Sequence, residues 1–189
     1  MKDKLYIGIS GKMGTGKSTL SDGIMKTIDS MTSTRVSMAT PIKRMQDNIY
    51  RDLGIEMEGE KDRDLLIALG MWGRGKHKDF WLQQGILEIE LAKEAIIICD
   101  DIRFENEANW FKKNGILMRI EGEQRGPNVD DNKESITETA LDNFNFDYYI
   151  DNRIDQEAMI MCALYCIAQH LKVSDTLMAQ CAEELHKEG

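Results

Sequence analysis

The sequence predicts an α/β protein with a mostly parallel, five-stranded sheet. Short apolar runs alternate with longer segments whose apolar residues recur at helical spacing, which is typical of parallel strands joined by crossover helices. The run Ala95–Cys99 is continuously apolar, as expected of a strand covered on both faces. A glycine-rich stretch, Gly8–Leu20, directly follows the first apolar run. Together these observations predict a sheet with helices on both faces and a specialised loop after its first strand.

The elements can be assigned along the chain from these patterns. The predicted strands are Leu5–Ile9, Arg35–Met38, Ala95–Cys99, Ile116–Ile120 and Asp147–Ile150. The predicted helices are Lys17–Asp29, Pro41–Asp52, Asp62–Met71, Asp79–Ala92, Phe104–Lys113, Ile154–Leu171 and Ser174–Lys187. Thr40 is expected to cap the second helix, with Pro41 at its first position. The pair Asn114-Gly115 is expected to end the fifth helix.

The composition is that of one globular domain spanning residues 1–189, with 42% hydrophobic and 30% charged residues. No apolar segment reaches the ~18–20 residues that cross a bilayer, and the start MKDKLYIGIS has no signal-peptide region. We therefore expect a cytoplasmic protein with no membrane partner. The net charge of −9 argues against a nucleic-acid polymer as partner, but leaves room for a small anionic ligand in a locally basic pocket.

Cysteine and histidine give no metal-binding pattern. The cysteines are Cys99, Cys162, Cys166 and Cys181, and none forms a CxxC pair. The three histidines are scattered and lack the spacing of metal ligands. We expect the cysteines to be buried, reduced thiols.

The glycine-rich stretch matches the Walker A pattern GxxxxGK[ST] over Gly11–Ser18. Glycines allow backbone N–H groups to surround phosphate oxygens, and the following helix adds its positive N-terminal end. Lys17 would reach the β- and γ-phosphates of ATP, and the Ser18 hydroxyl would bind Mg²⁺. The predicted nucleotide-binding residues are Gly11, Lys12, Met13, Gly14, Thr15, Gly16, Lys17, Ser18 and Thr19.

Two acidic residues, Asp100 and Asp101, follow the buried run Ala95–Cys99. This arrangement resembles a Walker B element, in which a carboxylate at the carboxyl end of a strand holds the Mg²⁺ shell. Because ligands bind beyond the carboxyl ends of parallel strands, Lys17 and Asp101 are expected at the same edge of the sheet. The metal residues are thus predicted to be Ser18, Asp101 and Asp100. The guanine-binding motif NKxD is absent, which argues against a GTP-dependent switch.

Several further segments resemble the phage-type deoxynucleoside monophosphate kinase family. These are ISGK at 9–12, PIK at 41–43, DIRFENE at 101–107, NGILMRI at 114–120, ETALD at 138–142 and FDYYIDN at 146–152. The resemblance covers roughly residues 4–155. It implies a P-loop kinase three-layer sandwich with a helical acceptor-binding insert at about 41–94, a lid loop at about 121–135 and C-terminal helices at 154–189.

The activity that the resemblance implies is transfer of the γ-phosphoryl group of ATP to a deoxynucleoside monophosphate (dNMP), giving dNDP and ADP. Family members often carry a histidine three residues before Glu138, where this chain has Ser135. No histidine role can therefore be assigned at that position.

Phosphoryl transfer requires positioning and charge neutralisation more than covalent chemistry. The predicted catalytic residues are Lys17, Arg103, Arg74 and Asp101. The predicted acceptor-binding residues are Lys43, Trp72, Arg74, Phe80, Trp81, Arg103, Arg125 and Glu138. Structural alternatives exist for each: Arg103 could pair with Glu105 or Glu107, and the aromatic residues could be ordinary core residues.

Other functions also fit a phosphate-binding loop. One is a P-loop kinase for another phosphorylated acceptor, such as phosphomevalonate or dephospho-coenzyme A. Another is a regulatory module that binds ATP without turnover. The apolar spacing of the terminal helices is explained by packing, and a homodimer face built from them is an open alternative.

Overall fold

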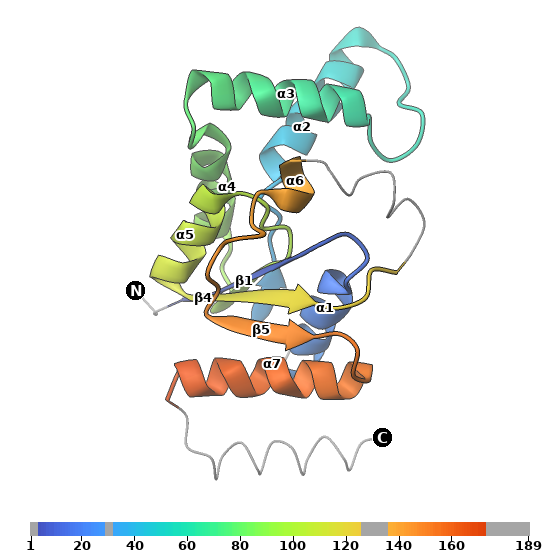
Figure 1. Ribbon diagram of the computed structural model, residues 1–189. Coiled ribbons are helices and arrows are strands. Elements are labelled where there is room, and N and C mark those ends of the chain that lie inside the picture. Colours follow the sequence, from blue (N-terminus) through green and yellow to red (C-terminus); the bar gives the residue numbers. More distant parts are fainter. Residues whose placement is uncertain (1–3, 29–31, 126–135, 173–189) are drawn as a thin grey trace. The chain divides into compact units, whose positions relative to one another are not determined.

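The computed structural model describes residues 4–28, 32–125 and 136–172 (Figure 1). Its sheet has five strands in the order β2-β3-β1-β4-β5, and all four pairings are parallel. The strands are β1 Leu5–Gly11, β2 Ser33–Arg35, β3 Ile96–Cys99, β4 Ile116–Glu121 and β5 Tyr148–Asp151. The predicted α/β fold with a parallel five-stranded sheet is confirmed.

The chain divides into two compact units. The first comprises residues 1–35 and 94–189 and contains the whole sheet. Its helices, among the residues that the structure describes, are α1 Lys17–Ile28, α5 Glu105–Asn114, α6 Ile136–Thr139 and α7 Gln156–His170. The second unit, Val36–Lys93, holds α2 Thr40–Leu53, α3 Arg63–Lys76 and α4 Phe80–Leu91.

Helices cover both faces of the sheet in the first unit. On one face, α1 and α7 pack against the strands, and fully buried side chains such as Ile9, Leu20 and Ile24 fill the space between them. On the other face, α5 packs on β1 and β4. Gly8 permits this approach, because a Cβ there would lie 2.7 Å from the Phe111 ring. Continuous apolar strands buried on both faces therefore produce the three layers.

Parallel pairing brings the carboxyl ends of the strands to one edge. The loop after β1 carries the Walker A residues, Asp100 and Asp101 follow β3, and Asn152 follows β5. The chain leaves β4 at Glu121 and passes this same edge, where the Asn152 N–H donates to Glu121 O at 2.9 Å. The site is assembled here.

The second unit is a group of three packed helices. Asp62 caps α3 by accepting the Leu65 N–H at 2.9 Å, and its carboxylate also accepts from the Tyr50 hydroxyl at 2.7 Å. The helix continues to Lys76, beyond the predicted end at Met71. Gly73 lies in this additional turn, and a Cβ there would lie 2.4 Å from Trp81 Nε1, so the glycine lets α3 and α4 approach closely.

Several element boundaries differ from the predictions. The second strand lies earlier than Arg35–Met38, because Ser33 is already paired with Ile96 and the sheet pairing ends at Arg35. Thr40 is not the cap of α2; Ala39 holds that position, and the Thr40 N–H donates to Ser37 O at 3.0 Å.

Two helix boundaries in the first unit also differ. Gly115 follows α5 in extended conformation, with no room for a Cβ beside Tyr6 O, instead of forming a left-handed cap. At the C-terminal side, α7 begins at Gln156, because Asp155 caps it through the Ala158 N–H at 3.0 Å. The predicted helix Ser174–Lys187 lies outside the described residues.

The expectation that the cysteines are buried is wrong for Cys162, which is exposed on α7, while Cys99 is buried and Cys166 is half-buried. Cys181 lies outside the described residues. Within the part of the chain that the structure describes, no helix is both long enough and apolar enough to span a membrane.

Candidate active site

The Walker A loop joins β1 to α1 and is closed by its own hydrogen bonds. Lys12 O accepts both the Thr15 N–H (3.3 Å) and the Thr15 hydroxyl (2.8 Å). Gly14 and Gly16 have φ of +77° and +90°, a region that other residues rarely adopt. At Gly14 a Cβ would also lie 2.2 Å from Arg125 O. The glycines thus allow a turn that side chains would block.

Lys17 begins α1 and lies against this loop. Its ammonium donates to Gly11 O at 2.7 Å and to Lys12 O at 2.8 Å. Burial, followed by the neighbouring Arg103 guanidinium, lowers the pKa of Lys17 below its ordinary 10.5. The carboxylates of Glu138, Asp100 and Asp101 act in the opposite direction. The first unit therefore brings together two cations and three carboxylates beside the phosphate-binding loop.

Asp100 is tied to the first helix. Its Oδ2 accepts the Ser21 hydroxyl at 2.8 Å, and Arg35 Nε lies 3.5 Å from the same oxygen. Ser21 is one helical turn beyond Ser18, whose carbonyl accepts the Ser21 hydroxyl at 3.0 Å. Asp101 instead accepts from the Cys99 thiol at 3.1 Å. Asp100 is therefore in hydrogen-bonded contact with the helix that carries Ser18.

These donors fit Mg²⁺, which prefers carboxylate and hydroxyl oxygens and keeps water and phosphate ligands. The Ser18 hydroxyl is on an exposed residue at the start of α1, and the Asp100 carboxylate is held one turn away. Among the described residues no group of three His, Cys, Asp or Glu side chains could hold a metal by itself. Mg²⁺ would thus be held by Ser18, Asp100 and nucleotide oxygens, with Asp101 nearby.

Arg103 follows β3 and pairs with Glu138 of the four-residue helix α6, Nη1 to Oε1, at 3.3 Å. The other oxygen of Glu138 accepts the Met13 N–H of the Walker A loop at 2.7 Å. Arg103 keeps 41% of its side chain exposed and Glu138 only 5%. The guanidinium is therefore held by a buried carboxylate yet stays accessible to a ligand.

Glu107 fixes the turn that carries Arg103. Its Oε2 accepts the backbone N–H groups of Arg103 (2.8 Å) and Phe104 (3.1 Å). Burial raises the pKa of Glu107 to about 7, although these two hydrogen bonds favour the ionised form. The predicted alternative of an Arg103–Glu107 salt bridge is thus replaced by a backbone contact, and the guanidinium pairs with Glu138.

One pocket, of about 480 Å³, lies along the Walker A loop and the start of α1. Its lining comprises Gly14, Thr15, Gly16, Lys17, Ser18, Thr19, Arg125, Asn152, Ile154, Gln156 and Met159. The predicted residues Gly14–Thr19 and Arg125 therefore share one pocket. The Arg125 side chain is 68% exposed and pairs with Glu123 at 2.9 Å.

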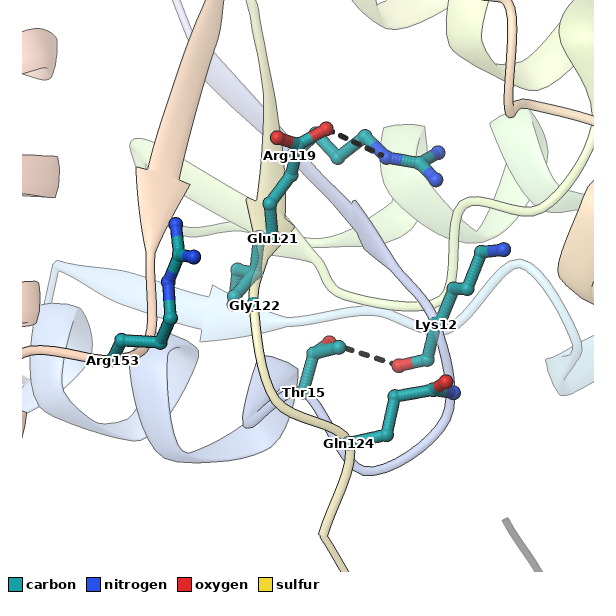
Figure 2. A pocket seen from close by; sticks show the side chains of 8 residues that line it. Lys12, Thr15, Arg119, Glu121, Gly122, Gln124 and Arg153 are labelled. Carbon is teal, nitrogen blue, oxygen red and sulfur yellow. Dashed lines mark hydrogen bonds and ion pairs between the residues drawn. The ribbon is translucent and has the colours of Figure 1, made fainter. Parts of the chain in front are cut away.

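A second pocket, of about 340 Å³, lies on the β4–β5 side of the loop (Figure 2). Lys12, Arg119 and Arg153 line it together with Glu121. Asp142 pairs with Lys12 at 3.2 Å and with Arg119 at 2.9 Å, while Arg119 also donates to Leu141 O at 3.0 Å. Asp142, in the segment that follows α6, therefore links Lys12 of the Walker A loop to Arg119 of β4 through ion pairs.

Five of the residues predicted to bind the acceptor belong to the second unit. They are Lys43, Trp72, Arg74, Phe80 and Trp81. Phe80 makes edge contacts with Trp72 (5.6 Å) and Trp81 (5.0 Å). The Trp81 indole donates to Gly70 O at 3.2 Å, which makes Trp81 a packing residue of this unit. Trp72 is 48% exposed and lies under the Lys76 ammonium. Their acceptor role stays a prediction.

Sequence reasoning missed several residues of the site. Arg35, Glu107, Arg119 and Asn152 all contact the elements that carry the Walker A and Walker B residues, yet none was assigned a role. Glu107 and Asn152 do lie inside segments that resemble a kinase family, which was the available signal. Arg119 also lies inside such a segment, 114–120, whereas Arg35 carried no signal, because it is a single cation in an ordinary strand pattern.

The fold, the Walker A loop and a match to the model of a kinase family together define the class of protein: this is a P-loop small-molecule kinase, an ATP-dependent phosphotransferase. Two solved structures resemble it in fold. TT1252 from Thermus thermophilus has 17% identity, with 90% of this chain and 99% of that chain covered, at a TM-score of 0.55. A shikimate kinase from Aquifex aeolicus has 11% identity, with 90% and 100% covered, at a TM-score of 0.52.

The model of the phosphomevalonate kinase family matches residues 9–116, more than half of the 189-residue chain. The chain belongs to the phosphomevalonate kinase family. No curated protein matches it in sequence.

Proposed function

We propose that the protein transfers the γ-phosphoryl group of ATP to the phosphate of a deoxynucleoside 5′-monophosphate, giving dNDP and ADP. The observation that carries this proposal is that the accessible Arg103 guanidinium is held at the Walker A loop: it pairs with Glu138, which accepts the Met13 N–H, and its charge acts on the buried Lys17. Neighbouring carboxylates offset part of the charge of these two cations, and a bound polyanion would offset the rest. A donor triphosphate beside an acceptor phosphate is such a polyanion.

In the proposed reaction an oxygen of the acceptor phosphate attacks the γ-phosphorus. The bond between that phosphorus and the β–γ bridging oxygen breaks, and ADP leaves. Lys17 and the loop N–H groups stabilise charge on the donor, and Arg103 stabilises charge on the transferring group or the acceptor. When bound, Mg²⁺ would neutralise part of the negative charge of the nucleotide phosphates.

A phosphate acceptor also fits the state of the carboxylates near Lys17. Glu138 is engaged by Met13 and Arg103, Asp100 by Ser21, and Asp101 by the Cys99 thiol. An alcohol acceptor benefits from a base that accepts its proton. A phosphate monoester is already ionised near neutral pH, so its oxygen needs no such base. This favours a phosphate over an alcohol as the attacking group.

The deoxynucleotide is favoured by the segments after residue 116, which lie beyond the match to the phosphomevalonate kinase family. In them, Glu138 contacts the Walker A loop through Met13, Asp142 through Lys12, and Asn152 through Thr15. These segments are among those that resemble deoxynucleoside monophosphate kinases. The half-exposed Trp72 ring adds a surface suited to stacking on a base.

Phosphomevalonate is the second candidate acceptor, and the family match is the observation that favours it. It too presents a phosphate monoester, so Lys17 and Arg103 would act in the same way. The two candidates differ in the rest of the acceptor: a base and a deoxyribose, or an aliphatic hydroxy acid.

An acceptor panel tests the proposal. ADP release with MgATP would be followed with the four common dNMPs, the ribonucleotides, phosphomevalonate and dephospho-coenzyme A. We expect the highest kcat/KM with one or more dNMPs. Highest turnover with phosphomevalonate would replace the first candidate with the second. ATP binding without turnover of any acceptor would favour the regulatory alternative.

The matched control is Lys17→Ala. It should lower phosphoryl transfer on the order of a thousandfold or more, because a charge that stabilises the transition state is lost. Its circular dichroism spectrum should stay that of the wild type. Turnover by this variant at the wild-type rate would contradict the proposed mechanism.

A further inference from the structure

Three consecutive carbonyls of the Walker A loop are held from the outside by the segments that follow β4 and β5. Gln124 Nε2 donates to Met13 O at 3.0 Å, the Arg125 N–H donates to Gly14 O at 2.9 Å, and Asn152 Nδ2 donates to Thr15 O at 3.0 Å. Gln124 lies beside the loop that carries Lys12 and Thr15 (Figure 2). We call these three contacts the carbonyl clamp.

The clamp constrains the amides that would meet phosphate. A trans peptide unit is planar, so its C=O and the N–H of the next residue point in opposite directions. Holding Met13 O and Thr15 O from outside therefore directs the N–H groups of Gly14 and Gly16 away from the clamp. Both glycines have positive φ, and glycine loses little energy when a neighbouring peptide plane rotates. Without external anchors these two amides would be poorly fixed.

Asn152 is itself rigidly held. Its buried side chain donates a second hydrogen bond to Glu123 O at 2.6 Å and accepts from the Glu123 N–H at 2.8 Å. Gly122 has φ +122°, and a Cβ there would lie 2.1 Å from Asn152 Oδ1. The carboxamide therefore uses both of its donor hydrogens on carbonyls, one in the Walker A loop and one in the chain leaving β4. A carboxylate of the same size could not do so.

We propose that Gln124 and Asn152 are positioning residues, which orient the Gly14 and Gly16 amides toward the phosphates of the nucleotide. This inference rests on the proposed function in one respect, namely that the ligand of the loop is ATP. Neither side chain needs to touch the nucleotide phosphates. Their effect is on affinity, because an oriented amide has no rotational freedom to lose on binding.

The test uses isosteric variants, Asn152→Asp and Gln124→Glu, with Asn114→Asp as the control. Asn114 is an exposed carboxamide on α5 that donates to Trp110 O. The dissociation constant for MgATP would be measured by calorimetry between pH 5.5 and 8.5, at a temperature where every variant is fully folded. Each dissociation constant is divided by the wild-type constant at the same pH. This ratio cancels the effect that protonation of ATP itself has on binding.

At pH 8 we expect Asn152→Asp to weaken ATP binding by at least about tenfold, because an ionised carboxylate would face two carbonyls in place of donors. The ratio should fall toward acid pH, where the protonated carboxyl regains one donor. Gln124→Glu should act in the same direction more weakly, and Asn114→Asp should bind ATP as the wild type does.

A ratio near one for Asn152→Asp at pH 8 would overturn the inference and leave the proposed function intact. A weakened affinity that does not recover at acid pH would also overturn it. Such a result would indicate a general structural defect, because protonation of the carboxyl should restore one hydrogen-bond donor. Absence of ATP binding by the wild type would overturn the proposed function, and this inference with it.

Discussion

The carboxylate of Glu138 accepts a hydrogen bond from the Met13 N–H at 2.7 Å, across 125 positions of sequence. The same carboxylate pairs with Arg103 at 3.3 Å. A negative group from α6 therefore sits on the phosphate-binding loop and offsets part of the positive charge there. A nucleotide must bind close to this carboxylate or displace it.

Glu138→Gln should strengthen ATP binding by about three- to tenfold, because it removes one partly screened negative charge that repels the phosphates of ATP. The amide oxygen can still accept the Met13 N–H, so the loop should keep its shape. Calorimetry with MgATP in the absence of acceptor measures this, with the exposed Glu105→Gln on α5 as control. Unchanged or weaker binding would show that the carboxylate does not oppose the nucleotide.

The pH dependence of kcat/KM for ATP should reveal the ionisation of Lys17. Lys17 must be charged to bind phosphate, and burial together with Arg103 lowers its pKa below 10.5. The profile of kcat/KM for ATP should therefore fall on the alkaline side below pH 10.5. Because Glu138 raises the pKa of Lys17, Glu138→Gln should shift this alkaline limb to lower pH. A limb that stays in place or shifts upward would contradict the assignment.

The two acids after β3 should differ in their effect on Mg²⁺. Asp100 contacts Ser21, one turn from Ser18, whereas Asp101 accepts from the Cys99 thiol. Asp100→Asn should raise the Mg²⁺ concentration needed for half-maximal activity by about tenfold or more, and Asp101→Asn should raise it less. Titration of Mg²⁺ at fixed ATP measures both, and the reverse order would identify Asp101 as the nearer ligand.

Glu107 should make stability depend on pH. Burial raises its pKa from 4.5 to about 7 in the folded protein, so the folded state binds this proton more tightly than the unfolded state does. The free energy of unfolding should therefore fall as the pH rises from 4.5 to about 7, by roughly 3 kcal/mol at most. Urea unfolding at pH 5 and pH 8 measures the difference. Glu107→Gln should reduce it, and an undiminished difference in that variant would assign it to other groups.

The local parts of the site could be predicted from sequence. The Walker A residues are contiguous, so their pattern alone specifies a glycine loop between a strand and a helix. Asp100 and Asp101 follow a continuous apolar run, and parallel strands deliver residues to one edge by geometry alone. The same reasoning placed all five strands within a few residues of their positions.

The remaining parts depend on long-range contacts that carry no local pattern. The Glu138–Met13 contact comes from a helix of four residues, too short for periodicity to reveal. Arg35 reaches Asp100 only because β2 pairs with β3, and the second strand was placed too late to suggest this. Ala39 rather than Thr40 holds the cap position of α2, because the chain already turns at Ser37, whose carbonyl accepts the Thr40 N–H and whose hydroxyl accepts the Ala39 N–H.

The central claim is that the γ-phosphoryl group moves to a phosphate acceptor at this loop. The most direct measurement is to incubate the protein with a dNMP and ATP labelled in the γ-phosphate, then to separate the products. The account predicts that the label appears in the β-phosphate of dNDP and that Lys17→Ala abolishes this transfer. Label found only in inorganic phosphate, or retained in ATP with every phosphorylated acceptor, would contradict it.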